Sequence, residues 1–148
     1  MIGMDMSLLA IAAIVVPFAA ALVIVVSPQR AAKWWCVGAA AVSTALTLAV
    51  WAAFAGSGEE SVTVTLAMLG DAEVIGLVFD KVSVLLAPCF VGIGLLIGIY
   101  SIGYMNAGNR EHADAPRRRF YAFFTVFIGA MAGVVFSSTV VGQLMFFE

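Results

Sequence analysis

Charged residues are scarce in this sequence. Only 11% of its 148 residues are charged, 64% are hydrophobic, and the charged residues fall into a few short stretches. A water-soluble domain of this length needs charges spread over its whole surface, so the composition excludes one. The net charge of −2 provides no basic surface for nucleic acid. We therefore expect the lipid bilayer to be the main partner, and no nucleic acid to bind.

Histidine and cysteine are also scarce. His112 is the one histidine, and Cys36 and Cys89 are the two cysteines. A metal cluster or a Ser–His nucleophile pair cannot be assembled from one histidine in a polar loop. The cysteines lie at different depths of their predicted helices, whereas a disulfide needs Cα atoms within about 7 Å. The sequence also contains no P-loop, GxGxxG, haem or quinone pattern. We expect no catalytic residue, no metal and no cofactor.

The sequence does contain long uncharged runs. At 1.5 Å per residue, a run of about 20 residues in a helix crosses a hydrocarbon core about 30 Å thick. The fold class expected is therefore all-α integral membrane, with residues 1–148 as a single membrane domain. Four complete transmembrane helices are predicted at about 8–26, 34–55, 82–105 and 120–138, and the start of a fifth at 140–148.

The first run, 8–26, also has the length of a secretory signal peptide. No Lys or Arg precedes it, and no small-residue cleavage pattern clearly follows it, so a membrane helix is favoured. Pro17 and Pro88 lie inside the first and third predicted helices. There we expect neighbouring helices to satisfy the carbonyls that proline leaves without an amide partner.

Glycines at GxxxG spacing occur in two of the predicted helices. Gly94 and Gly98 share one face of the third helix, and Gly129 and Gly133 share one face of the fourth. Small residues at this spacing allow helix backbones to approach closely, although such spacings also arise by chance in apolar sequence. We expect these two faces to need partner helices from outside the chain.

Residues 56–81, between the second and third predicted helices, alternate in polarity. Apolar residues are separated by smaller or polar ones before a Gly-Asp pair and a second apolar stretch, 74–79. This pattern predicts a short β-hairpin with its turn at Gly70-Asp71. The alternating apolar residues are Val62, Val64, Leu66 and Met68.

The distribution of cations predicts an orientation. Six of the seven Lys and Arg residues lie in two connections, 27–33 and 106–119, while loop 56–81 carries five acidic residues against Lys81. Cation-rich loops stay in the cytoplasm. We therefore predict a multi-pass protein of the cell inner (plasma) membrane, with the N-terminus and loop 56–81 outside. The arginines of 106–119 are interpreted as topological anchors rather than as substrate-binding residues.

Several motifs follow one another in a series that resembles a known family. The chain is similar to the N-terminal part of the proton-conducting, antiporter-like membrane subunits. These include the large antiporter-like subunits of complex I, Mrp-type Na⁺/H⁺ antiporter subunits and subunits of hydrogenase-4 and membrane-bound hydrogenases. The motifs are Phe79-Asp80, Ser83, 91–96 (VGIGLL), 100–105 (YSIGYM), 119–121 (RFY), 127–131 (FIGAM) and 144–148 (LMFFE).

The resemblance implies a many-helix subunit built around two inverted repeats with broken helices, which passes protons along buried Glu and Lys residues. The sequence departs from the family at Lys81, where Gly is common, and at Phe147, where Trp is common. It also has 137–139 (SST) where the family has a Ser-Asp-Asn-like turn. These departures leave open which branch the chain resembles most.

Glu148 is the predicted proton-translocating residue. Counting from the expected turn at 137–139, it lies about 13 Å along the fifth helix, near the middle of the membrane. A carboxylate at this depth favours a partner cation, a water-filled cavity or protonation. The resemblance implies the same role, because Glu148 matches the Glu of the family's fifth helix. The alternative is that a Glu at this position frays towards the interface.

Two classes of function remain. In the first, the chain is part of a proton- or Na⁺-translocating subunit of a complex I-like, Mrp-type or hydrogenase complex. Its partners are then other membrane subunits, including a chain that supplies the remaining helices. At most it is then a non-catalytic, ion-translocating subunit of an oxidoreductase. In the second, it is a structural or assembly subunit, or an inactive truncated fragment.

Overall fold

The structure is a computed structural model that describes residues 2–105 and 117–148. Its elements are α1 (Ile2–Val26), α2 (Gln29–Ser57), β1 (Ser61–Leu69), β2 (Ala72–Asp80), α3 (Ser83–Tyr104), α4 (Arg117–Phe136) and α5 (Val140–Phe147). Helices α1 to α4 are long and apolar enough to cross a membrane. The predicted fold class is thereby confirmed: four membrane helices, a hairpin between the second and third, and the start of a fifth.

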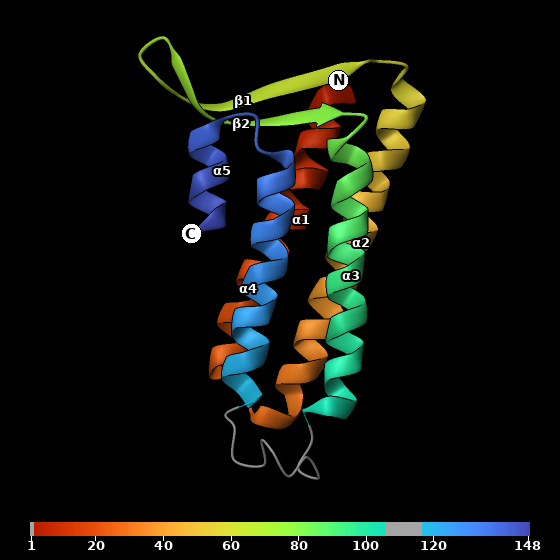
Figure 1. The fold of residues 1–148 in the computed structure, drawn as a ribbon, viewed down its shortest axis with the longest axis vertical. Coiled ribbons are helices and arrows are strands. Elements are labelled where there is room, and N and C mark those ends of the chain that lie inside the picture. Colours follow the sequence, from red (N-terminus) through yellow and green to blue (C-terminus); the bar gives the residue numbers. More distant parts are fainter. Residues whose placement is uncertain (1, 106–116) are drawn as a thin grey trace.

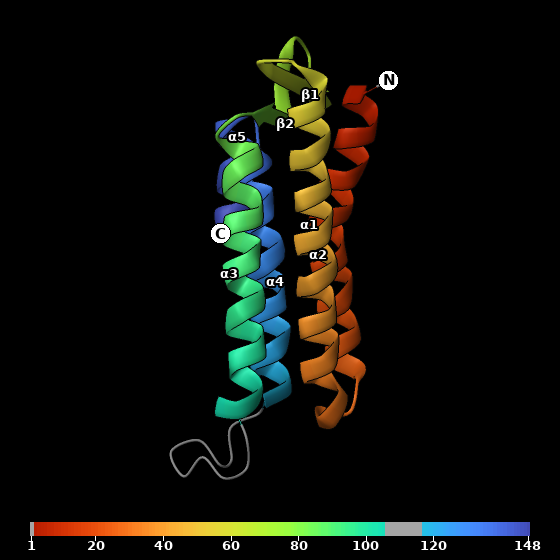
Figure 2. The same cartoon turned by 90° about the vertical axis from the view of Figure 1, so that its right-hand side faces the viewer.

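The four long helices run side by side, and the hairpin lies across one end of them (Figures 1 and 2). Helix α1 packs against α2 and α4, and α3 packs against the same two helices. Helices α2 and α4 also contact each other, so they form the short diagonal of the bundle. We call the end that carries the hairpin and the α4–α5 turn the hairpin end, and the opposite end, where α4 begins at Arg117, the arginine end (Figure 1).

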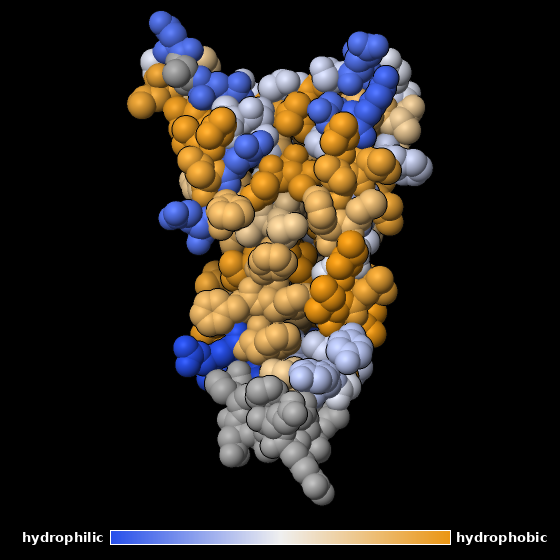
Figure 3. Space-filling view, in the orientation of Figure 1, coloured by the Kyte–Doolittle hydropathy of each residue, from blue (hydrophilic) through white to orange (hydrophobic). Residues whose placement is uncertain are grey.

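The outer surface of the bundle is apolar between these two ends. Figure 3 shows hydrophobic residues over the middle of one face and hydrophilic residues mainly towards its ends. Large apolar side chains of the four long helices are exposed, among them Leu22 at 73% and Phe123 at 69%. This is the surface expected of a protein whose solvent is lipid.

The second and fourth helices begin earlier than predicted. Helix α2 starts at Gln29, so Arg30 and Lys33 belong to its first turns and not to a loop. Arg117 likewise opens α4, while residues 106–116 of the predicted inner loop, including His112, lie outside the described residues. The difference arises because a long cationic side chain can extend from a helix end to the interface, so a charge does not mark the end of a helix.

The hairpin has the predicted turn. β1 and β2 pair antiparallel from Ser61 opposite Asp80 to Leu69 opposite Ala72. Gly70 in the turn has a φ of 64°, a left-handed conformation that glycine adopts without a steric penalty. Near its base the hairpin rests on the helices, whereas towards the tip Leu69 is 78% exposed.

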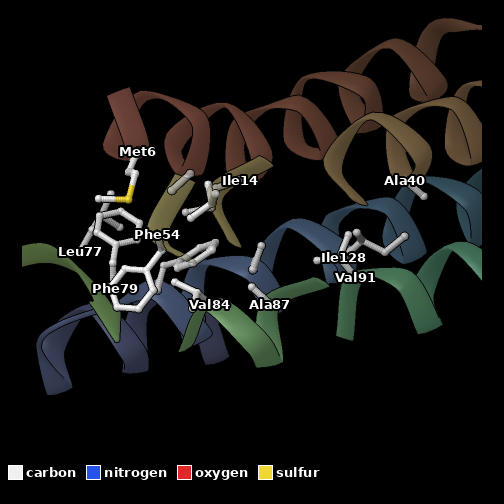
Figure 4. Packing of buried hydrophobic residues seen from close by; sticks show 14 residues of the cluster. Met6, Ile14, Ala40, Phe54, Leu77, Phe79, Val84, Ala87, Val91 and Ile128 are labelled. Carbon is white, nitrogen blue, oxygen red and sulfur yellow. The ribbon is translucent and has the colours of Figure 1, made fainter. Parts of the chain in front are cut away.

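The larger of two clusters of buried hydrophobic side chains extends from beneath the hairpin into the bundle (Figure 4). Met6 of α1, Phe54 of α2 and Phe79 of β2 belong to one cluster. The ring of Phe79 lies 5.6 Å from that of Phe136 on α4, a separation typical of favourable aromatic pairs. A smaller cluster at the arginine end includes Ile24, Cys36 and Tyr121. The hairpin is therefore part of the core and not a detached loop.

The carbonyl left without a partner by Pro17 is satisfied by a neighbouring helix. Proline has no amide hydrogen, so the carbonyl of Ala13, four residues earlier in α1, receives no helical hydrogen bond. The hydroxyl of Ser43 on α2, which is fully buried, donates to that oxygen at 2.6 Å. The prediction for Pro17 is confirmed, and Ser43 also links α1 to α2.

The glycine faces are used within the chain. A Cβ added at Gly94 would lie 3.0 Å from Ile128 of α4, and one at Gly98 would contact Phe124 of α4. A Cβ at Gly129 would lie 3.0 Å from the Ile14 carbonyl of α1. The expectation of close helix packing is confirmed, but the expectation that these faces need partners from outside was wrong. The neighbouring helices of the same chain already occupy them.

The start of α3 is capped by side chains from the end of the hairpin. Asp80 Oδ1 accepts hydrogen bonds from the amides of Val82, at 3.1 Å, and Ser83, at 2.6 Å, while the Asp80 amide donates to the Ser83 hydroxyl. Such bonds satisfy amides that have no partner in the first helical turn. The bond from the Ser83 amide is the main reason that the pKa of Asp80 lies below its ordinary value, against a smaller opposing effect of burial.

We predict that Asp80→Ala lowers the stability of the protein by about 1 kcal/mol at pH 7, because the amides of the first turn lose their acceptor. Asp80→Asn keeps an acceptor oxygen and should cost less. Because folding lowers the Asp80 pKa, its electrostatic contribution is complete above the unfolded pKa of about 3.9 and is lost as the pH falls through the folded pKa.

Thermal unfolding in detergent between pH 7 and pH 3 measures both effects. The advantage of the wild type over Asp80→Asn should shrink as the pH falls through this range. Asp71→Ala, at the exposed turn of the hairpin, is the control and should be neutral. Equal losses from Asp71→Ala and Asp80→Ala would contradict the capping role.

Candidate ion-translocation site

Helix α5 leads directly to the predicted functional residue, Glu148, and begins at a defined cap. The side chain of Thr139 accepts a hydrogen bond from the Gly142 amide at 3.1 Å, and its carbonyl accepts one from the Gln143 amide at 3.0 Å. Threonine is a favoured N-cap because its oxygen satisfies an amide of the first turn. The chain therefore reverses after α4 within three residues, 137–139, and starts a new helix immediately.

The hairpin holds this turn in place. The Thr139 hydroxyl donates to the Val74 carbonyl at 2.7 Å, and the Ser138 amide donates to the Gly76 carbonyl at 3.0 Å. The Ser138 hydroxyl also donates to the Glu73 carboxylate at 2.9 Å. These three bonds join β2 to a turn about 65 residues later in the chain. We call this set of bonds the hairpin clamp.

Close packing fixes α5 along α4. A Cβ added at Gly133 would lie 2.5 Å from the ring of Phe146, so only glycine leaves room for that ring at its present position. Gly142 is buried at the start of α5, where an added Cβ would collide with the Ser137 hydroxyl. Glycine at both positions allows α5 to return beside α4 rather than project away from it.

Glu148 follows directly after α5. Its amide donates to the Leu144 carbonyl at 3.1 Å, so its backbone continues the helical turn, and its side chain is exposed. Figure 1 shows this end of the chain beside α4, part of the way from the hairpin end to the arginine end. Within the described residues, no ion pair involves Glu148. Helix α5 packs against α4 and also contacts β2.

The sequence did not predict the hairpin clamp. The turn at 137–139 and the hairpin were each expected, but nothing in the local pattern indicated that they touch. A possible signal is the placement of two hydroxyl side chains, Ser138 and Thr139, in a connection between two apolar helices. Hydroxyls there favour a cap, and a cap at a membrane boundary can also bind a neighbouring segment.

The geometry defines a multi-pass helical membrane protein in which a hairpin clamps the turn into a fifth helix. Residues 72–121, from β2 to the start of α4, match the family model described as NADH-Ubiquinone oxidoreductase (complex I), chain 5 N-terminus. This match confirms the resemblance to antiporter-like membrane subunits over that segment. Glu148 lies outside the matched residues.

Individual relatives agree with this match. The Na⁺/H⁺ antiporter subunit A1 of Staphylococcus aureus (strain bovine RF122 / ET3-1) is 36% identical over 72 residues, which are 49% of this chain and 8% of that protein. The NAD(P)H-quinone oxidoreductase chain 5 of Picosynechococcus sp. is 36% identical over 94 residues, which are 62% of this chain and 13% of that protein. The chain thus aligns with about a tenth of the length of these relatives.

We predict that Thr139→Val loosens α5, because valine keeps the shape of threonine but can neither cap the Gly142 amide nor bind the Val74 carbonyl. Loss of an N-cap costs about 1 kcal/mol. Hydrogen exchange at the Gly142 and Gln143 amides should therefore accelerate by roughly fivefold.

Thr63→Val is the matched control, since Thr63 is exposed on β1 and no side-chain hydrogen bond of its own is recorded within the described residues. It should leave exchange in α5 unchanged. Equal exchange in wild type and Thr139→Val would show that the clamp does not hold the helix.

Proposed function

We propose that this chain forms the N-terminal part of a proton- or Na⁺-translocating, antiporter-like membrane subunit, and that Glu148 is a titrating residue of the translocation path. The observation that carries the proposal is the position of Glu148 at the end of a helix, α5, that runs back beside α4. The similarity of residues 72–121 to complex I chain 5 supports the class of subunit.

The depth of Glu148 supports a titrating role. Helix α4 has 20 residues, so it is about 30 Å long, which is enough to span a hydrocarbon core. Glu148 lies nine residues after the cap Thr139, about 13 Å back along this path. A carboxylate there costs about 2.5 to 3.5 kcal/mol on insertion scales. A protonated state, a cation or a hydrated cavity lowers that cost, and each of these allows a proton to be exchanged.

The exposure of Glu148 indicates what completes the site. Its side chain is not covered by the helices described here, so further helices would have to enclose it, on the same polypeptide or on another subunit. This is consistent with an alignment that covers about a tenth of the length of the relatives. Other membrane subunits of a multi-subunit complex are the partners that we propose.

The second candidate is a structural subunit that contributes to assembly alone. The observation that favours it is the apolar exposed face of α5, where Val140 and Leu144 are 70% and 58% exposed. Such a face packs against a partner helix whether or not Glu148 titrates. Replacing the carboxyl group while keeping this face intact separates the two candidates.

We predict that Glu148→Gln abolishes or strongly reduces cation movement while the complex still assembles. Glutamine keeps the size of the side chain but has no titrating group. The measurement is proton and Na⁺ movement in vesicles containing the complex purified from native membranes.

Glu60→Gln is the matched control, because Glu60 is exposed at the hairpin end and outside the membrane helices. It should leave transport unchanged. Full transport with Glu148→Gln would end the proposal and favour the structural role. Loss of proton movement with Na⁺ movement retained would identify the coupled ion as H⁺.

We also propose that the chain lies in the inner (plasma) membrane with the hairpin end outside and the arginine end in the cytoplasm. Arg30, Lys33 and the three arginines that open α4 all lie at one end, whereas the hairpin end carries mostly acidic residues. This asymmetry supports the orientation through the preference of cationic segments for the cytoplasm.

We predict opposite labelling of cysteines placed at the two ends, in a chain whose Cys36 and Cys89 have been replaced by alanine. Ser57→Cys at the end of α2 should react with a membrane-impermeant thiol reagent added outside. Gln29→Cys, at the start of the same helix, should react only when the cytoplasmic side is opened. The reverse pattern would overturn the orientation.

A further inference from the structure

A cavity at the arginine end is lined by cations from two helices. Arg30 and Lys33 of α2 and Arg117 of α4 line a cavity of about 230 Å³, together with Gln29 and Tyr121. Its remaining wall is apolar and comes from the end of α3. The sequence had placed these cations in two separate loops. The fold brings them to one concave site, whose volume accommodates a phosphate group.

The cations of this cavity lack anionic partners among the residues that the structure describes. No acidic residue is among the described lining residues, and no ion pair involves Arg30, Lys33 or Arg117 there. Lys33 lies 5.4 Å from the centre of the Trp34 ring, a contact that leaves its charge uncompensated. By contrast, Arg118 points elsewhere and donates to the Ser27 carbonyl at 3.4 Å.

Helix dipoles add to the positive potential of the cavity. The N-terminal ends of α2 and α4 both lie at this site, and each end carries a partial positive charge. Neither helix has an acidic residue in its first turn, and α2 has no side-chain cap. A cation near a helix N-terminus is destabilising, because it lies beside the partial positive charge of the helix dipole. A bound anion would offset both the dipoles and the crowded side-chain charges.

The position of the cavity indicates the source of the anion. It lies where three membrane helices end, with Ile102 and Met105 on its apolar side. Trp34 and Trp35, near the start of α2, are 63% and 50% exposed, and exposed tryptophans are typical of the headgroup level of a bilayer. Basic pockets between membrane helices at this level recognise anionic headgroups.

We propose that this cavity binds the phosphate of an anionic phospholipid, with Arg30, Lys33 and Arg117 as its ligands. The site is distinct from the ion path at Glu148 and does not depend on the proposed transport. The three cations would then bind one lipid molecule at a defined site, in addition to being attracted to the membrane surface in general.

The test compares lipid binding by the full chain and its variants in detergent, with native mass spectrometry used to titrate phosphatidylglycerol and, separately, phosphatidylcholine. The wild type should retain one phosphatidylglycerol in preference to phosphatidylcholine. Arg117→Gln should weaken this binding by about tenfold, because a charge-assisted hydrogen bond is lost. Arg30→Gln combined with Arg117→Gln should abolish it.

Arg119→Gln is the matched control, because Arg119 lies in the same turn of α4 but lines a different cavity with Arg118. It removes the same charge and should change binding by less than about twofold. A second double variant, Arg118→Gln combined with Arg119→Gln, is the control for Arg30→Gln combined with Arg117→Gln. Circular dichroism verifies that each variant is folded, and Arg117→Gln alone suffices if the double variant does not fold.

Three outcomes would overturn the proposal. Equal weakening by Arg117→Gln and Arg119→Gln would mean diffuse attraction to charge. Equal retention of phosphatidylglycerol and phosphatidylcholine would mean that the anion is not recognised. Displacement of the lipid by millimolar inorganic phosphate would assign the cavity to a soluble anion instead of a lipid headgroup.

Discussion

The hairpin clamp is the interaction on which the hairpin end of the molecule depends. In an apolar solvent every backbone polar group needs a partner inside the protein, and a turn between two membrane helices leaves several without one. Here β2 supplies the acceptors for Ser138 and Thr139. The same strand carries Phe79 into the core and ends at Asp80, which caps α3. One strand thus connects the starts of two helices and covers the bundle between them.

Much of the fold could be predicted because its signals are local. Apolar length alone indicates a membrane helix, and alternation with a Gly-Asp pair indicates a hairpin. The start of α2 was placed five residues late because Arg30 and Lys33 were taken as loop residues. The clamp between Val74 and Thr139 could not be predicted, since no sequence rule pairs a strand with a turn 65 residues away. Glu148 stays a prediction, made from its expected depth along the fifth helix and from the resemblance to the family.

The charged side chains at the two ends of the bundle have different kinds of partners. At the hairpin end, Asp80 and Glu73 accept hydrogen bonds that the fold itself supplies. At the arginine end, Arg30 and Arg117 meet in a cavity without a carboxylate from the described residues. The first arrangement stabilises the hairpin end through hydrogen bonds of the fold itself. In the second, none of the described lining residues neutralises the cations.

The hydrogen bond from Ser43 to the Ala13 carbonyl, which Pro17 leaves without a helical partner, affects how α1 and α2 align. Two smooth apolar helices can slide past each other at little cost, because one hydrophobic contact replaces another. A single bare carbonyl removes that freedom, since a shift of one turn would leave it unpaired in hydrocarbon. Pro17 and Ser43 together therefore fix the axial alignment of α1 against α2. During evolution the two residues should be kept or lost as a pair, because a lineage that replaced the proline would no longer need the serine.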